Sequence, residues 1–256
     1  MKSISVLGCG WFGLPFAKQM VQAGYLVNGS TTSTDKLASL KEESISSYLI
    51  DVHDLDTCDT SFFDTDILVV CLTGKVITSF EKLIDIINQS RIRKVIFTSS
   101  TSVYDNCNCT VDESTPKNDK PLSQIEDLFL DSKNNFEATI VRFAGLFGYN
   151  RKPGNFFPKS GAPMRNPEGY INLIHQDDCV AIVKQIIEQG LWGEIFNLSA
   201  PSHPSRREFY SKEKAKLHTE KPLFDEHATN EYKIVSSEKI VNALDYKFIY
   251  GDLMKY

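Results

Sequence analysis

A glycine-rich turn between a short apolar strand and an amphipathic helix most limits how this chain can fold. Ser3–Leu7 is a largely apolar, strand-like segment that runs directly into the G-x-G-x-x-G sequence Gly8–Gly13. A helical pattern follows and is closed by Gly24. Three glycines at this spacing let a pyrophosphate rest against backbone amides at a helix start, where a side chain would hold it away. Strand, turn and helix in this order predict a dinucleotide-binding βαβ unit.

Strand-like and helix-like runs alternate along the first 150 residues, which is typical of βαβ units and a parallel sheet. After Gly148 the chain becomes richer in Pro, Gly and Asn. We therefore predict the α/β class, with a Rossmann-like doubly wound parallel sheet and a small C-terminal α/β substrate lobe. The expected strands are Ser3–Leu7, Leu26–Ser30, Ser47–Ile50, Asp66–Leu72, Arg93–Thr98, Ala138–Phe143 and Glu194–Leu198, and the expected helices include Phe80–Ser90 and Cys179–Glu188.

The two predicted parts are an NAD(P)-binding Rossmann domain over residues 1–150 and a smaller substrate-binding lobe over 151–256. They are expected to interleave, with Cys179–Leu198 packing back on the core. A loop over or beside the site is expected at Arg151–Pro167. Its four basic residues fit an anionic ligand or a solvated basic loop equally well: Arg151, Lys152, Lys159 and Arg165.

Composition excludes several classes of protein. A net charge of −5 gives no general affinity for nucleic acid or anionic membranes. No apolar run approaches the ~20 residues that span a bilayer. The N-terminus enters a strand without a basic region or cleavage site, so we expect a cytoplasmic protein. The six cysteines follow no framework spacing; Cys107 and Cys109 lack the partners of a zinc site and are expected to lie reduced in a surface loop, so no metal is predicted.

The end of the second strand favours NADP over NAD. NAD-selective sites place an acid at this strand tip to bind the ribose hydroxyls. Here the strand tip carries hydroxyl residues, Ser30–Thr34, followed by Lys36, a set suited to a 2′-phosphate. Helix capping and turn formation would explain the same hydroxyls for either cofactor, and Asp35 stands late but near. Asp51, at the end of the third strand, is placed either to meet the adenine or to cap the strand end.

Several segments in sequence order resemble the extended short-chain dehydrogenases/reductases, the NAD(P)-dependent epimerase/dehydratase family. They begin with Gly8–Gly13 and the fifth-strand motif Thr98–Tyr104. Val141–Gly148, Asn172–Asp178 and Glu194–Leu198 resemble further elements of the family. The tail is similar to an atypical subgroup described as nucleoside-diphosphate-sugar epimerase-like. The resemblance implies a nicotinamide cofactor, and homodimers are common in the family.

The same resemblance assigns Ser100, four residues before Tyr104, to the serine that hydrogen-bonds the substrate oxygen. It also implies a Tyr-x-x-x-Lys pair on the next helix, which performs proton transfer. The chain departs from the family here, because Pro121–Phe129 contains neither a tyrosine nor a correctly placed lysine. Tyr210–Lys214 has the right spacing, but we interpret it as chance on a solvated helix of the C-terminal lobe.

Three residues remain as catalytic candidates: Ser100, Tyr104 and His175. Tyr104 either supplies a phenol near the nicotinamide or packs as an aromatic, and His175 either moves a proton or ties a neighbouring aspartate to the backbone. Arg142, at a strand end, is interpreted as a buried pairing partner rather than a substrate clamp. The residues expected to contact the cofactor are Gly8, Gly10, Trp11, Phe12, Gly13, Ser30, Thr31, Thr32, Asp51, Thr73 and Ser99.

Two functions fit these features. The first is an NADP-dependent oxidoreductase or epimerase that acts on a small sugar-like or carbonyl substrate through a non-standard acid/base site. The second is a catalytically silent NADP(H)-binding sensor, which the missing Tyr-x-x-x-Lys pair favours. Whether the chain is an enzyme stays open at this point.

Overall fold

The computed structural model describes residues 2–132, 135–156, 162–218 and 222–256. The chain forms two compact units and passes between them several times. The first unit contains Met1–Val103, Asp119–Arg142 and Val180–Ile195. The second contains Tyr104–Asn118, Phe143–Cys179 and Phe196–Tyr256.

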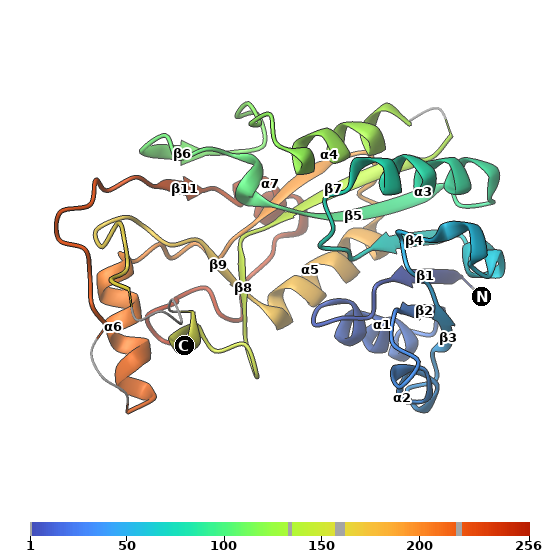
Figure 1. The fold of residues 1–256 in the computed structure, drawn as a ribbon, viewed down its shortest axis with the longest axis horizontal. Coiled ribbons are helices and arrows are strands. Elements are labelled where there is room, and N and C mark those ends of the chain that lie inside the picture. Colours follow the sequence, from blue (N-terminus) through green and yellow to red (C-terminus); the bar gives the residue numbers. More distant parts are fainter. Residues whose placement is uncertain (1, 133–134, 157–161, 219–221) are drawn as a thin grey trace. The chain divides into compact units, whose positions relative to one another are not determined.

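The main sheet has seven strands in the order β10-β7-β5-β4-β1-β2-β3, and strands β1 to β5 lie wholly in the first unit. The pairs from β3 to β5 are parallel. The order reverses beside β1, which is the signature of a doubly wound sheet and confirms the predicted fold class. The strands, visible in Figure 1, are β1 (Ser3–Leu7), β2 (Leu26–Thr31), β3 (Ser46–Leu49), β4 (Ile67–Val70), β5 (Lys94–Ser100), β7 (Glu137–Phe143) and β10 (Ile195–Leu198).

Helices cover both faces of this sheet. In Figure 1, α3 and α4 lie on one face, and α1 and α2 on the other. Phe80 of α3, Phe97 of β5 and Phe129 of α4 form one aromatic cluster, in which Phe97 and Phe129 stack with ring centroids 4.6 Å apart. Such contacts anchor the amphipathic helices to the sheet. The helices are α1 (Gly13–Gln22), α2 (Lys36–Glu42), α3 (Ile77–Gln89), α4 (Pro121–Asp131) and α5 (Gln176–Gln189).

Most predicted boundaries agree with the structure to within a few residues; β4 is shorter than the predicted strand Asp66–Leu72, and polar residues extend β5 and α5. All four residues of β4 are buried, as expected for a central parallel strand. Strand β5 continues two residues beyond its apolar run, through Ser99 and Ser100. Helix α5 begins at Gln176, three residues before the predicted start, because Asp177 and Asp178 suit the first turn of a helix.

In its described residues, the second unit contains two small parallel sheets and the α-helices α6 and α7. Strand β6 (Cys109–Val111) pairs with β11 (Lys233–Val235), and β8 (Gly145–Phe147) pairs with β9 (Leu173–His175). Helix α6 (Arg206–Lys216) begins with a capping box between Ser205 and Glu208, and α7 (Glu238–Leu244) follows β11.

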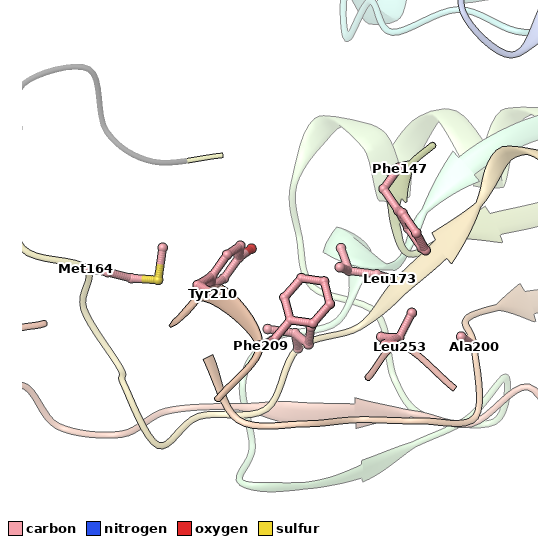
Figure 2. Close-up of a cluster of buried hydrophobic side chains, with 8 residues drawn as sticks. Phe147, Met164, Leu173, Ala200, Phe209, Tyr210 and Leu253 are labelled. Atoms are coloured by element: carbon pink, nitrogen blue, oxygen red, sulfur yellow. The ribbon is translucent and has the colours of Figure 1, made fainter. Parts of the chain in front are cut away.

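One prediction about the second unit is wrong: helix α6 is not simply a solvated helix. Phe209 and Tyr210 of this helix are buried in the hydrophobic core of the unit, in the cluster that also contains Met164, Leu173 and Leu253 (Figure 2). Burial raises the pKa of the Tyr210 phenol, which opposes its use as an acid or base near neutral pH. The spacing of Tyr210 and Lys214 therefore does not mark a displaced catalytic pair.

The predicted basic loop is only partly covered by the structure. Pro153–Asn155 forms a short 3₁₀ helix, and the side chains of Arg151, Lys152 and Arg165 are exposed. Lys159 lies outside the described residues. Among the described residues, no helix combines the length and the apolar character needed to cross a bilayer.

Candidate functional site

The glycine-rich turn joins β1 to α1, and its three glycines have different surroundings. Gly8 has φ +100°, and a Cβ there would lie 2.8 Å from the carbonyl oxygen of Cys71. A Cβ on Gly13 would lie 2.1 Å from the carbonyl oxygen of Gly8. A Cβ on Gly10 would meet nothing within 4 Å. Packing inside the chain therefore requires glycine at Gly8 and Gly13, whereas Gly10 borders open space.

The end of β2 holds the glycine turn in place. The Gly8 N–H donates to Ser30 Oγ at 2.9 Å, and the Cys9 N–H donates to the Ser30 carbonyl oxygen at 2.8 Å. Ser30 is 1% exposed, so its hydroxyl serves the turn. Thr31 is also buried, and its Oγ1 accepts from the Ser33 N–H at 3.2 Å. Thr32, which follows, is exposed.

The remaining residues predicted to contact the cofactor in the first unit lie near the same edge of the sheet. Leu7 pairs with Val70 and Val70 pairs with Phe97, so β1, β4 and β5 end side by side. Carboxyl ends of parallel strands are where ligands bind in such sheets. Residues of the turn and of these strand ends fall there: Trp11 and Phe12 in the turn, Asp51 after β3, Thr73 after β4, and Ser99 and Ser100 at the end of β5.

These residues differ in exposure. Thr73 and Asp51 are exposed, and one carboxylate oxygen of Asp51 accepts from the His53 N–H at 2.9 Å. The Trp11 side chain is half-buried. The Phe12 side chain is buried and stacks on the ring of Phe16. The aromatic ring of Phe12 therefore packs in the core, and its backbone is the part that belongs to the turn.

A buried ion pair lies beneath the end of β5. Arg142 of β7 forms two hydrogen bonds from Nε to Glu126, at 3.0 and 3.2 Å, and one from Nη2 at 2.7 Å. Both side chains are at most 2% exposed. Ser99 Oγ donates to Oε1 of Glu126 at 2.6 Å. The prediction that Arg142 is a buried pairing partner is confirmed.

Sequence reasoning missed Glu126 as the partner of Arg142. A signal was present, because Glu126 lies on the apolar face of α4, between Leu122, Ile125 and Phe129, all of which are buried. An acid within such a stripe needs a cationic partner. The helix contains no tyrosine or lysine between Pro121 and Asp131, and its charged buried group is committed to Arg142.

Ser100 ends β5 and is half-buried. Its Oγ accepts from the Ser102 N–H at 3.2 Å. A hydroxyl that accepts in this way still has its proton to donate, so Ser100 can hydrogen-bond an oxygen of a ligand at this edge.

Tyr104 belongs to the second unit and is 2% exposed. Its hydroxyl donates to Asn197 Oδ1 at 3.0 Å, and the Asn197 N–H donates to the Glu113 carboxylate at 2.6 Å. Lys233 Nζ donates to the Tyr104 carbonyl oxygen. The phenol is thus held in a buried hydrogen-bonded chain within this unit.

His175 also belongs to the second unit, at the junction of β9 and α5. Its Nδ1 accepts from the Asp177 N–H at 3.2 Å. Its Nε2 faces Gly148, where a Cβ would lie 2.7 Å away. The ring packs against Tyr250 with centroids 3.8 Å apart, and burial lowers the pKa of the imidazole below 6.5. His175 is therefore a neutral, packed ring near pH 7.

Asp178, the next buried group of α5, ties the C-terminal segment to this helix. Its carboxylate accepts from the Tyr246 hydroxyl at 2.9 Å and from the N–H groups of Ile249 and Tyr250 at 2.8 and 3.1 Å. Burial of the Tyr246 phenol and the negative charge of the Asp178 carboxylate raise the pKa of Tyr246. The motif containing His175 thus organises the second unit.

The prediction that Cys107 and Cys109 are reduced is wrong for this structure, in which they form a disulfide. Asn108 between them has φ +54°, which brings the two Cα atoms to 5.2 Å, within the range that a disulfide allows. The other four cysteines have free thiols. Within the described part of the chain, no three His, Cys, Asp or Glu side chains gather as a metal site would require.

Comparison with known proteins identifies a clear relative in sequence. No protein-family profile matches the chain. The Escherichia coli protein YeeZ, in strains K12 and O157:H7, is 32% identical over 270 residues, which cover 98% of this chain and 97% of YeeZ.

Solved structures share the fold at low identity. A conserved protein of unknown function from Silicibacter pomeroyi aligns with a TM-score of 0.82 at 16% identity, covering 99% of this chain and 95% of that protein. The UDP-glucuronic acid 4-epimerase of Bacillus cereus, in complex with NAD, aligns with a TM-score of 0.79 at 17% identity over the same shares. The fold is therefore that of the NAD-dependent epimerases, as the sequence motifs predicted.

Proposed function

The chain belongs to the YeeZ family and has the fold of NAD-dependent epimerases, and from this premise we propose that it binds a nicotinamide dinucleotide at the carboxyl edge of its sheet. The observation that carries the proposal is Gly10. Packing inside the chain explains glycine at Gly8 and Gly13 but not at Gly10, whose Cα faces open space. A pyrophosphate pressed against the backbone at the start of α1 accounts for a glycine there.

We propose NADP rather than NAD as the preferred cofactor. Ser30 and Thr31 are buried and bonded to the backbone, so they support the turn instead of the ribose. The exposed residues after this strand end are Thr32, Thr34, Asp35 and, at the start of α2, Lys36, and of these Thr32 and Lys36 are the groups we assign to the phosphate. A hydroxyl and an ammonium group suit a 2′-phosphate, whereas no acid ends β2 to bind a free 2′-hydroxyl.

The cofactor preference can be tested with a matched pair of lysines on α2. Lys36→Met should weaken NADPH binding by about fivefold, the effect of one exposed charge pair worth ~1 kcal/mol, and leave NADH binding unchanged. Lys41→Met removes the same charge from the last turn of α2 and should change neither affinity. Equal effects on NADPH and NADH would remove Lys36 from the 2′-phosphate site.

We further propose an oxidoreductase or epimerase that acts on a small carbonyl or sugar-like substrate. The bound dinucleotide supplies hydride chemistry. Ser100, at the end of β5, donates a hydrogen bond to the substrate oxygen, and the Ser102 N–H fixes the direction of its hydroxyl. The buried Ser99–Glu126–Arg142 network holds this strand end in position. With no tyrosine or lysine on α4, a water molecule held by Ser100 is the simplest carrier of the proton.

A second function, a catalytically silent NADP(H)-binding sensor, is favoured by one specific observation. The hydroxyl of Tyr104 and Nδ1 of His175 are engaged in hydrogen bonds within the second unit, and both side chains are buried. In a sensor, the nucleotide pocket would persist while these groups serve packing alone.

Calorimetric titration with NADPH and NADH, followed by a screen of carbonyl and sugar-nucleotide substrates, separates the two functions. Turnover that falls in Ser100→Ala, with NADPH affinity retained, supports the enzyme. Tight binding without turnover across the panel supports the sensor. Failure of both nucleotides to bind would contradict the proposal as a whole.

A further inference from the structure

We propose that Cys107 and Cys109 form a reversible redox site, whose disulfide a dithiol reductant can open. The state of this disulfide controls the contacts between the loop of residues 107–109 and Tyr232, and through them the pairing of β6 with β11. This proposal concerns the second unit and does not depend on nucleotide binding. It rests on three features: the disulfide itself, its exposure, and the hydrogen bonds made by the residues around it.

The two cysteines of the pair are exposed, whereas the other four cysteines are buried or half-buried. Cys9 and Cys179 are buried, and burial raises the pKa of each thiol, so neither offers a thiolate for exchange. A thiolate from solvent can reach either sulfur of the Cys107–Cys109 bond directly.

The disulfide closes a three-residue loop that is hydrogen-bonded to the backbone of Tyr232. The N–H groups of Cys107 and Asn108 both donate to the Tyr232 carbonyl oxygen, at 3.1 and 2.8 Å. In return, the Tyr232 N–H donates to Asn108 Oδ1 at 2.9 Å. Both backbone polar groups of Tyr232 are therefore bound by a loop whose left-handed central residue is enclosed by the disulfide.

Strand β11 connects these contacts to Tyr104, one of the residues predicted from the sequence to be catalytic. Tyr232 directly precedes β11, where Lys233 pairs with Cys109. Lys233 Nζ donates to the carbonyl oxygen of Tyr104, the aromatic residue that ends the fifth-strand motif. A two-stranded sheet is marginal in water by itself, so its end contacts determine whether it persists. Opening the disulfide removes a constraint on Asn108 and loosens the contacts that follow.

The chemical step is thiol–disulfide exchange, and its balance is simple. A thiolate of the reductant attacks one sulfur, the Cys107–Cys109 bond breaks, and the other sulfur leaves as a thiolate. The second thiol of the reductant then resolves the mixed disulfide. The protein gains two electrons and two protons, and the dithiol becomes a disulfide.

Thiol counting tests the redox step. The folded protein is equilibrated in oxidised glutathione or in dithiothreitol, quenched in acid, unfolded, alkylated and weighed intact. Four labels are expected after oxidation and six after reduction, with return to four when the reductant is replaced by oxidised glutathione. Six labels in oxidised glutathione, or four in dithiothreitol, would overturn the proposal.

Hydrogen exchange tests whether the disulfide stabilises the contacts of Tyr232 and β11. The peptide that covers residues 230–236 should exchange faster in the reduced protein than in the oxidised one. The double variant Cys107→Ser/Cys109→Ser should exchange at the reduced rate in both buffers, and Cys58→Ser should behave as the wild type. Equal exchange of this peptide in both redox states of the wild type would refute the coupling, because the disulfide would then constrain nothing beyond itself.

Discussion

The glycine turn offers the sharpest test of the site, since alanine at Gly13 and at Gly10 should fail in different ways. A Cβ on Gly13 would lie 2.1 Å from the Gly8 carbonyl oxygen, whereas ordinary contacts start at 3.4 Å. The backbone of the turn or the start of α1 must therefore move by more than an ångström. Overpacking of this kind costs about 1–3 kcal/mol, and a rigid backbone oxygen places Gly13→Ala at the upper end, near ~3 kcal/mol.

Gly10→Ala should have the opposite profile. A Cβ there has no neighbour within 4 Å, so the folded state accommodates it. Because alanine gives the unfolded chain less conformational freedom than glycine does, the substitution should stabilise the folded protein by about 0.4–1 kcal/mol. The new methyl group occupies the surface where the pyrophosphate is proposed to press. We expect NADPH affinity to fall at least ~10-fold, or about 1.4 kcal/mol.

Urea unfolding and calorimetric titration of the two variants decide the matter. A free energy of unfolding for Gly13→Ala within ~0.5 kcal/mol of the wild type would show that the turn yields to the methyl group. Wild-type NADPH affinity in Gly10→Ala would show that no phosphate approaches this backbone. The second result would remove the observation on which the proposed nucleotide site depends.

Three further predictions concern buried polar groups. Glu126→Ala should destabilise by about 3–5 kcal/mol, because it leaves the Arg142 guanidinium buried without its carboxylate. Asp178→Asn should cost about 2–3 kcal/mol, since one acceptor oxygen becomes an amide donor facing backbone or tyrosine donors. For His175, burial lowers the folded-state pKa, so its contribution to stability is present above pH 6.5 and is lost as the pH falls from 6.5 toward that lowered pKa. His175→Asn should flatten this slope in urea midpoints measured across the window.

Matched controls keep these effects separate from general sensitivity to substitution. Glu137→Ala removes an exposed partner of Lys94 and should cost less than ~1 kcal/mol. Asp252→Asn changes an exposed turn aspartate that accepts from the Met254 N–H, and it should also cost less than ~1 kcal/mol. His203 is a second case of this pH dependence and not a control: burial lowers its pKa, so His203→Asn should remove a further part of the pH slope. A loss of less than ~1 kcal/mol in Glu126→Ala or in Asp178→Asn, or an unchanged slope in His175→Asn, would contradict the corresponding argument.

The fold could be predicted because its signals are local. The apolar run of β4 and the spacing of Phe80, Leu83, Ile84 and Ile87 in α3 each fit one period of secondary structure, and the structure buries those residues. The Gly8–Gly13 turn fixes the order of the first strand and helix by itself. The apolar pattern predicts a shorter β5 than the structure shows, because the strand continues through the polar residues Ser99 and Ser100.

The candidate site could be predicted only in part, because the role of a polar residue depends on partners distant in the sequence. The Tyr104 hydroxyl bonds to Asn197, 93 residues later, and the Tyr104 carbonyl oxygen bonds to Lys233, 129 residues later. Because the Tyr104 hydroxyl donates to a buried amide oxygen, these distant partners decide what the phenol does. The motif that places Tyr104 after β5 therefore specifies its position and leaves its chemistry to the second unit. For this reason the proposed nucleotide site, built from Gly8 to Ser30 on adjacent strands, follows from the sequence more directly than any proposed catalytic group does.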